Sequence, residues 1–216
     1  MANQESAYGL RPVGLVGSGA NSTGTTEYEI ASDNTNAIYQ FGICVPLAAG
    51  VITYAGATSG GTTQALGVLT GVMYHDSVKK KPVWLNYWPG SSSVSVDTNY
   101  PVKAYVADNP NQLFQVATDA TITSRATALL AVFANATLGT SARSGSTDTG
   151  RSSSALSVSS IATTATLPLR VVGIVDDDAN SDFTAAGIPL TVRLNAHFNA
   201  STRRFDSQTT ADSTGI

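Results

Sequence analysis

The sequence has very little of several residue types on which whole classes of function depend. Cysteine occurs once, at Cys44, so no disulfide can form within the chain and a secreted scaffold held together by cystines is excluded. Histidine occurs twice, at His75 and His197, and glutamate three times. A zinc site needs three or four His, Cys or carboxylate ligands, which this chain could supply only by recruiting aspartates. We therefore predict no metal site and no cofactor.

Charge is also scarce. Charged residues make up 12% of the chain, the formal net charge is −3 and the pI is about 5.2. A broad basic surface for a nucleic-acid backbone is therefore not expected. No window approaches the roughly 18 apolar residues of a membrane span, and residues 1–6 lack the basic start and apolar run of a signal peptide. We expect a protein made in the cytoplasm, with neither nucleic acid nor membrane as a partner.

Catalytic signatures are missing as well. The chain has no phosphate-binding P-loop, no glycine-rich dinucleotide fingerprint and no nucleophile elbow. Cys44 lies in the apolar run 42–47, which predicts a small buried side chain rather than a nucleophile. A triad of histidine, aspartate and serine is defined by geometry and not by sequence order, and nothing in the sequence favours one. We predict that the chain is not an enzyme and has no catalytic residue.

One acidic run imitates the start of a calcium-binding loop. Carboxylates or amides stand at 176, 178, 180 and 182. The sixth position of such a loop is Ser181, where a glycine is needed, and the twelfth is Gly187, where a bidentate glutamate belongs. The departures favour an acidic turn between two strands, with a calcium loop as the alternative.

Hydroxyl residues dominate what is present, with 24 serines and 27 threonines. Short runs rich in valine, isoleucine and threonine, bounded by turn residues, predict strands. They cover residues 27–30, 37–47, 51–55, 65–74, 100–107, 112–116, 167–175 and 188–198. The turn 108–111 predicts a hairpin between the strands on either side of it. One helix is predicted over 124–135, after a capping hydroxyl. The expected fold is mainly β, an antiparallel β-sandwich or β-barrel with long loops and at most one or two short helices.

The same pattern predicts the domain organisation. Residues 1–26 form an extended N-terminal arm, because Gly9 and Pro12 prevent a helix around its apolar island. Residues 27–206 form a single β domain, and residues 207–216 a polar tail. Within that domain, residues 138–160 are a long polar excursion with two open interpretations, a flexible linker or a segment held down by another chain.

Residues 74–90 hold both tryptophans, three of the four lysines and one of the two histidines. Large amphipathic rings concentrate packing energy, so the rings can anchor a subunit interface. They could also stack the bases of single-stranded nucleic acid beside the lysines at 79–81. The third interpretation is a solvated turn between two strands, which the acidic chain favours over nucleic acid.

Several segments, in order along nearly the whole chain, carry a family resemblance. They are 1–4 (MANQ), 8–14 (YGLRPVG), 67–74 (GVLTGVMY), 80–82 (KKP), 86–90 (NYWPG), 149–152 (TGRS), 167–173 (LPLRVVG), 178–180 (DAN) and 192–197 (VRLNAH). Together they resemble the small structural proteins of tailed-bacteriophage heads, namely the capsid decoration or cement proteins that accompany a major capsid protein. This family has no catalytic residues to carry over.

The resemblance implies a structural virion protein on the outer surface of an icosahedral head, assembled in the host cytoplasm. Its expected partners are the major capsid protein and copies of itself, as a trimer or another homo-oligomer, and its expected role is to tie capsomers together. The candidate interface residues come from the arm, the polar excursion and the aromatic stretch: Tyr8, Leu10, Arg11, Pro12, Lys80, Lys81, Trp84, Tyr87, Trp88 and Arg151.

An alternative from another class is a virion-surface β module that binds carbohydrate or a host surface through Trp84, Tyr87 and Trp88. Buried tryptophans would favour the decoration protein, and coplanar exposed ones would favour sugar binding.

Overall fold

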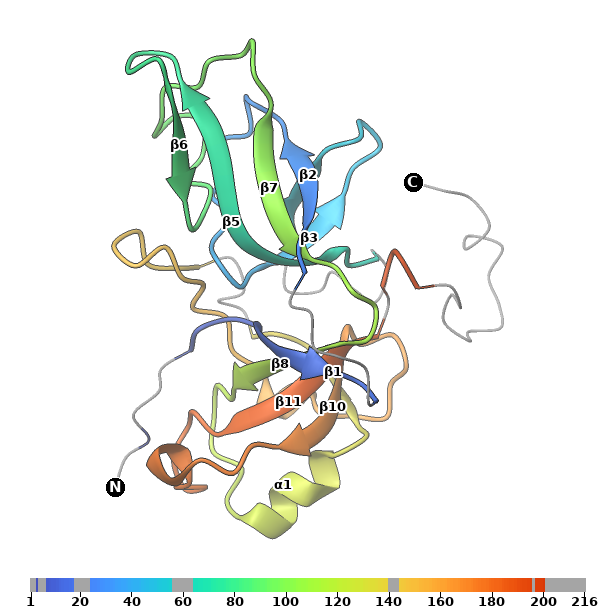
Figure 1. Ribbon diagram of the computed structural model, residues 1–216. Coiled ribbons are helices and arrows are strands. Elements are labelled where there is room, and N and C mark those ends of the chain that lie inside the picture. The colour runs from blue at the N-terminus through green and yellow to red at the C-terminus, as the bar shows by residue number, and fades with distance from the viewer. Residues whose placement is uncertain are drawn as a thin grey trace.

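A computed structural model describes residues 3, 7–17, 24–55, 64–139, 144–195 and 197–200. The protein is mainly β, as predicted, and its strands divide between two lobes stacked end to end (Figure 1). We call them the barrel lobe and the sheet lobe. Where the sequence suggests one β domain, the chain thus builds two sheets, each with its own core cluster.

The barrel lobe contains six strands in the order β3-β4-β2-β7-β5-β6, and β3 also pairs with β5, which closes five of the strands into a barrel. The bounds are β2 (Thr26–Ile30), β3 (Ile43–Pro46), β4 (Ile52–Tyr54), β5 (Gly67–Asp76), β6 (Lys81–Leu85) and β7 (Val102–Ala107). Strand β5 is long enough to serve both the barrel and an antiparallel hairpin with β6. The barrel interior holds Cys44, whose thiol is fully buried as predicted, and burial raises its pKa to about 12.

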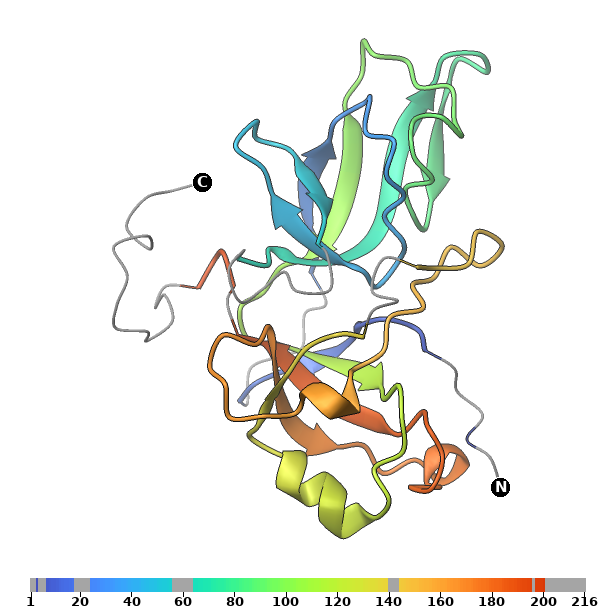
Figure 2. The same ribbon diagram turned by 180° about the vertical axis from the view of Figure 1, so that it is seen from behind.

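The sheet lobe contains five antiparallel strands in the order β1-β8-β11-β10-β9. Their bounds are β1 (Arg11–Leu15), β8 (Gln112–Ala117), β9 (Asn135–Ala136), β10 (Leu169–Ile174) and β11 (Pro189–Leu194). The helix α1 (Arg125–Ala131) lies at the end of this lobe farthest from the barrel (Figure 2), and two short 3-10 helices are η1 (Val158–Ser160) and η2 (Asp178–Asn180). Within the described ranges no helix is long and apolar enough to cross a membrane.

The predicted helix is confirmed in a shorter form. It begins where predicted, because the Ser124 Oγ accepts a hydrogen bond from the Thr127 N–H at 3.1 Å. It ends at Ala131, because Val132 is already extended and Phe133 adopts a left-handed φ of 71°.

The predicted hairpin between 100–107 and 112–116 is wrong. Strand β7 lies between β2 and β5 in the barrel, so neither of its edges is free for β8. Strand β8 pairs instead with β1 and β11. The turn at 108–111 is present, with the Gln112 N–H bound to the Asn109 carbonyl at 2.9 Å, but it carries the chain from one lobe to the other. The whole barrel, β2 to β7, is therefore inserted between two adjacent strands of the sheet lobe.

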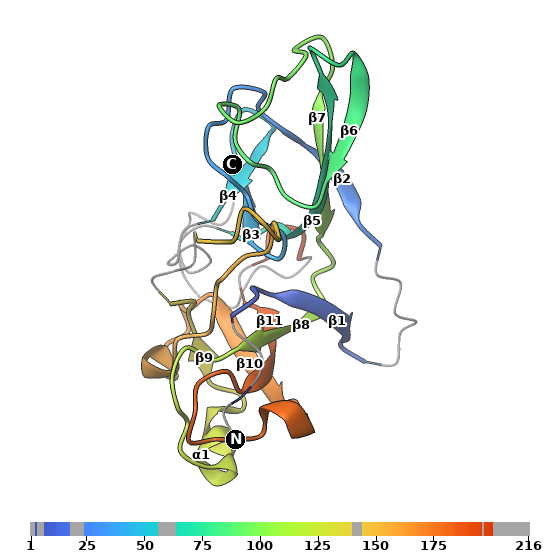
Figure 3. The same ribbon diagram turned by 90° about the vertical axis from the view of Figure 1, so that its left-hand side faces the viewer.

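A seam of backbone hydrogen bonds joins the lobes. The Gly9 N–H donates to the Ser154 carbonyl and the Leu10 N–H to the Phe41 carbonyl, both at 2.9 Å. The Gln40 N–H donates to the Gly150 carbonyl, and the Ser152 N–H to the Gln40 carbonyl, again at 2.9 Å. We call these segments, residues 7–10, 40–41 and 150–154, the seam; Figure 3 shows the blue N-terminal segment and the gold segment near residue 150 where the lobes meet.

Contacts within the chain also hold the described part of the excursion predicted over 138–160. Leu138 and Leu156 form a bridge, and both side chains are buried in the sheet-lobe core. Ser152 and Ser154 are buried in the seam and hydrogen-bonded to each other at 2.8 Å. Small hydroxyl side chains that hydrogen-bond to each other can be buried between two closely packed lobes. A prediction from composition alone assigns such a serine-rich segment to a loop.

Candidate functional site

The structure places the predicted arm residues against their own chain. Leu10 is fully buried in the sheet-lobe core and Tyr8 is buried beside it, with the Arg11 guanidinium 4.4 Å from the centre of the Tyr8 ring. Pro12 pairs with Phe114 in the β1–β8 ladder. The sequence correctly marks this island as apolar, and Tyr8 and Leu10 are buried by their own chain. Residues 1, 2, 4–6 and 18–23 of the predicted arm lie outside the described residues.

The three aromatic candidates do not share a surface. Trp88 is fully buried in the barrel core, where its Nε1–H donates to the Asn34 carbonyl at 3.0 Å. Trp84 is 57% exposed and packs against Tyr105, with ring centroids 4.8 Å apart. Tyr87 stacks on Tyr39 at 5.4 Å. The coplanar three-ring surface required for the sugar-binding alternative is therefore not formed.

Lys79 and Lys80 lie on the turn of the β5–β6 hairpin and Lys81 is the first residue of β6, which confirms a solvated turn between two strands. The Asp76 Oδ1 accepts the backbone N–H groups of Val78 and Lys79 at 2.9 and 2.8 Å, which holds the pKa of Asp76 below its ordinary value. Lys79 lies 3.7 Å from Asp76, and Lys80 4.0 Å from Asp97. These carboxylates offset two of the three positive charges, and Lys81 remains exposed.

The acidic side chains of residues 176–182 have separate hydrogen-bond and ion-pair partners and do not converge on one point. Asp176 pairs with Arg125. Asp177 caps η2 by accepting from the Asn180 Nδ2 and the Ala179 N–H, and these two bonds lower its pKa. Asp182 accepts from Thr184. Over the described ranges, no three His, Cys, Asp or Glu side chains are grouped so that they could hold a metal ion.

Neither histidine lies in a catalytic arrangement. His75 stacks on Tyr100 with ring centroids 4.1 Å apart. His197 is buried near Asp108 and Arg193, and its Nδ1 accepts the Asn199 N–H at 3.1 Å. Within the described structure, neither imidazole is hydrogen-bonded to a serine hydroxyl or a carboxylate.

The most exposed apolar residues gather at the two ends of the molecule. Leu129, Leu130 and Phe133, here called the α1 patch, are 55%, 81% and 78% exposed. At the far end of the barrel lobe, Val78 is 77% exposed on the turn after β5, and Trp84 lies on β6. Figure 1 shows α1 and the β5–β6 turn at opposite ends of the two-lobed structure.

Sequence reasoning missed the α1 patch. A helix of seven residues can turn only one stripe towards a core, and α1 buries Ala128 and Ala131. Leu129 and Leu130 are consecutive, so the face that buries the alanines leaves both leucines outside. That adjacency was the available signal.

Burial of His197 predicts a stability that depends on pH. Desolvation lowers the pKa of His197 from its ordinary 6.5 to about 4, so between these values the unfolded chain binds a proton that the folded chain excludes. The stabilisation that the folded state gains from a neutral, buried His197 is fully present above pH 6.5, and it is lost as the pH falls towards 4. We expect the free energy of unfolding to fall by about 3 kcal/mol across that window.

Urea unfolding at a series of pH values measures this slope, and His197→Gln should flatten it. His75→Gln is the matched control, because it removes the other imidazole and should leave the slope in place. Equal slopes for the wild-type protein and His197→Gln would show that His197 is not the responsible group.

Comparison of the chain with models of known protein families, with curated proteins and with solved structures finds no match. Function is therefore inferred from the chain's own residues.

Proposed function

We propose that this chain is a structural virion protein, a capsid decoration protein that binds the outer surface of an icosahedral phage head and stabilises contacts between capsomers. Its partners are the major capsid protein and further copies of itself. The observation that carries the proposal is the pair of exposed apolar surfaces at opposite ends of one molecule, the α1 patch and the β5–β6 turn.

The composition of the α1 patch supports a role in binding protein. Phe133 holds a left-handed backbone conformation, which costs an ordinary L-residue about 1–2 kcal/mol and in which helix ends usually place glycine. Its N–H donates to the Val171 carbonyl at 2.8 Å, so the conformation is fixed by the fold. The fold gains no burial energy from the exposed Phe133 ring to offset the cost of this backbone conformation. Burial of the ring against a partner protein would supply that energy.

Charge at this end favours an apolar partner surface. Arg125, on the first turn of α1, is already paired with Asp176. The patch itself carries no charge, so burying it leaves no ion without a counter-ion. Leucine and phenylalanine side chains of this kind fit a hydrophobic depression on the capsid shell.

The opposite end has a different character. Val78 and Lys80 lie on the exposed β5–β6 turn and Lys81 is the first residue of β6, so this surface combines an apolar anchor with positive charge. Such a surface suits a partner with an acidic rim. One molecule with two contact surfaces links two neighbouring capsid subunits, and each first contact raises the effective concentration for the second.

The seam makes such a link mechanically useful. Backbone hydrogen bonds join the lobes, in addition to side-chain contacts. A mechanical force applied at one end of the molecule is therefore transmitted to the other end. Binding only the assembled shell stabilises that shell by mass action.

Heads assembled without the protein provide the test. Purified protein should pellet with these heads, saturate at a fixed copy ratio and raise the temperature at which the shells rupture. The double variant Leu130→Ser/Phe133→Ser should weaken binding about tenfold or more, because exposed apolar anchors dominate such contacts. Leu47→Ser is the matched control, since Leu47 is also partly exposed and lies outside both surfaces. The proposal is wrong if the wild-type protein binds no mature or expanded head.

A further inference from the structure

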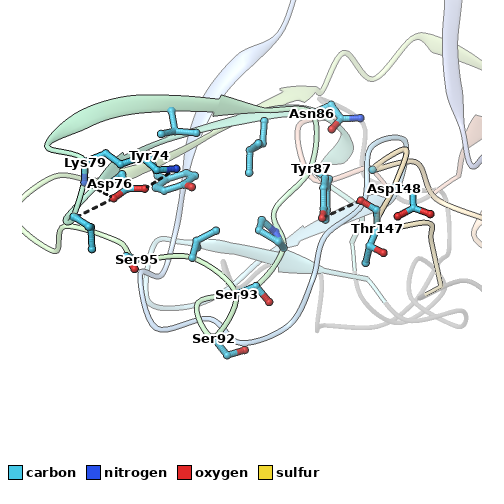
Figure 4. A pocket seen from close by; sticks show the side chains of 16 residues that line it. Tyr74, Asp76, Lys79, Asn86, Tyr87, Ser92, Ser93, Ser95, Thr147 and Asp148 are labelled. Carbon is cyan, nitrogen blue, oxygen red and sulfur yellow. Dashed lines mark hydrogen bonds and ion pairs between the residues drawn. The ribbon is translucent and has the colours of Figure 1, made fainter.

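An open cleft of about 860 Å³ lies beside the β5–β6 hairpin (Figure 4), and Val78 and Lys79 of the β5–β6 turn are among its lining residues. Three segments enclose it. The inner face of the hairpin forms the floor, the loop 89–95 forms one wall, and the loop 147–150 together with Tyr87 closes one end. The volume lies within the range of small-molecule sites in proteins.

The floor is apolar and partly aromatic. Tyr74 and Val83 are register partners in the hairpin, and Leu85 is two residues further along β6, so all three face the same side. Trp84 lies between Val83 and Leu85 and faces the other side, against Tyr105. The cleft and the exposed tryptophan are therefore on opposite faces of one hairpin.

The rim carries polar groups that the fold does not use. The hydroxyls of Ser92, Ser93 and Ser95 and the carboxylate of Asp148 line the cleft, and none of these side chains is hydrogen-bonded to a described residue. The Asn86 side-chain amide donates hydrogen bonds to the Thr149 carbonyl at 2.7 Å and to the Gln40 side chain. The side-chain carbonyl oxygen of Asn86 is therefore left as an acceptor.

The charges in the cleft restrict the chemistry of a ligand. Asp76 accepts two backbone N–H groups and pairs with Lys79, so its charge is offset. Asp148 remains as an unpaired carboxylate among the described lining residues. A phosphate or another anion would be repelled by Asp148 and would find Lys79 already engaged.

We propose that this cleft binds a neutral oligosaccharide. A sugar ring has an apolar face of C–H groups and an edge of hydroxyls, which match the aliphatic and tyrosine floor and the rim of hydroxyl, amide and carboxylate groups. Among the described lining residues the carboxylates are Asp76, which is paired with Lys79, and Asp148, and the proposal is for binding. The proposal is independent of capsid binding.

The test is a titration of the full-length ¹⁵N-labelled protein with maltohexaose, cellohexaose and chitohexaose at millimolar concentrations, followed by amide chemical shifts. At least one hexaose should shift amides of the loops 89–95 and 147–150 in a saturable way. Asp148→Ala should weaken that binding about tenfold, the usual effect of losing a hydrogen bond to a charged group. Ser93→Tyr, which fills the exposed mouth of the cleft, should abolish it.

Trp84→Ala is the control on the opposite face of the hairpin, and it should leave the affinity unchanged. The proposal is overturned if none of the three hexaoses shifts these amides. It is also overturned if Trp84→Ala removes binding while Ser93→Tyr does not, because the sugar surface would then be the exposed tryptophan.

Discussion

Replacing Trp88 with alanine is expected to destabilise the protein by about 3–5 kcal/mol, whereas the same change at Trp84 should cost about 1 kcal/mol. Trp88 is among the largest side chains that are fully buried, and it contacts Tyr74 edge-to-face with ring centroids 6.1 Å apart. Its removal leaves a large cavity and takes the donor from the Asn34 carbonyl. Trp84 is more than half exposed, so its loss removes mainly the contacts with Tyr105 and Gly71.

Urea unfolding of the two variants, followed by circular dichroism, measures the difference directly. Small domains have about 5–15 kcal/mol of stability in total, so Trp88→Ala removes a large share of it. If the alanine variant is not folded, Trp88→Phe gives a smaller loss in the same direction. Equal losses at the two tryptophans would contradict the assignment of Trp88 to the core.

Gly9→Ala should cost about 3 kcal/mol or more, because two separate penalties meet at this position. Gly9 has a φ of +83°, which a residue with a Cβ adopts only with strain. An added Cβ would also lie 2.5 Å from the Phe41 carbonyl oxygen and 2.9 Å from the Ser152 Cβ. Both obstacles belong to the seam, so the substitution should push the lobes apart.

Two other glycines of the same segment separate the penalties. Gly17 has a φ of +90° but no described atom within 4 Å of an added Cβ, so Gly17→Ala should show the conformational cost alone, about 1 kcal/mol. Gly14 has neither constraint, and Gly14→Ala should change stability by less than about 0.5 kcal/mol. Thermal unfolding ranks the three variants. If Gly9→Ala is as stable as Gly17→Ala, the seam segments can move apart around the added Cβ with little loss of stability, and the predicted steric penalty is wrong.

Local chemistry accounts for what the sequence predicts well. The β class, most strand positions, the capped helix and the buried Cys44 follow from propensity, periodicity and turn residues, all of which act over a few neighbouring residues. The same turn residues at 108–111 are compatible with a hairpin and with a crossover between lobes. The choice depends on β2 and β5, which occupy both edges of β7 from distant positions in the chain.

The tryptophans show why the candidate site is harder to predict. Positions 84 and 88 have the same parity, so in an uninterrupted strand both rings would face one side. Strand β6 ends at Leu85, and the bend at residues 86–87 turns Trp88 into the barrel, where it bridges Ile38. Likewise, the burial of Tyr8 and Leu10 depends on segments more than 30 residues away, and no local pattern encodes that contact.

The position of the barrel between β1 and β8 has a consequence for how such a chain can change in length. Leu15 and Gln112 are register partners, so the points where the chain leaves and re-enters the sheet lobe are adjacent. A gene segment can be lengthened, shortened or exchanged there without altering the order of the five strands. The exchange is not free, because Ile43, Val45 and Val68 of the barrel complete the core of the sheet lobe. Any replacement module would have to supply an apolar base of the same shape, whereas its far end, including the β5–β6 turn, could diverge freely.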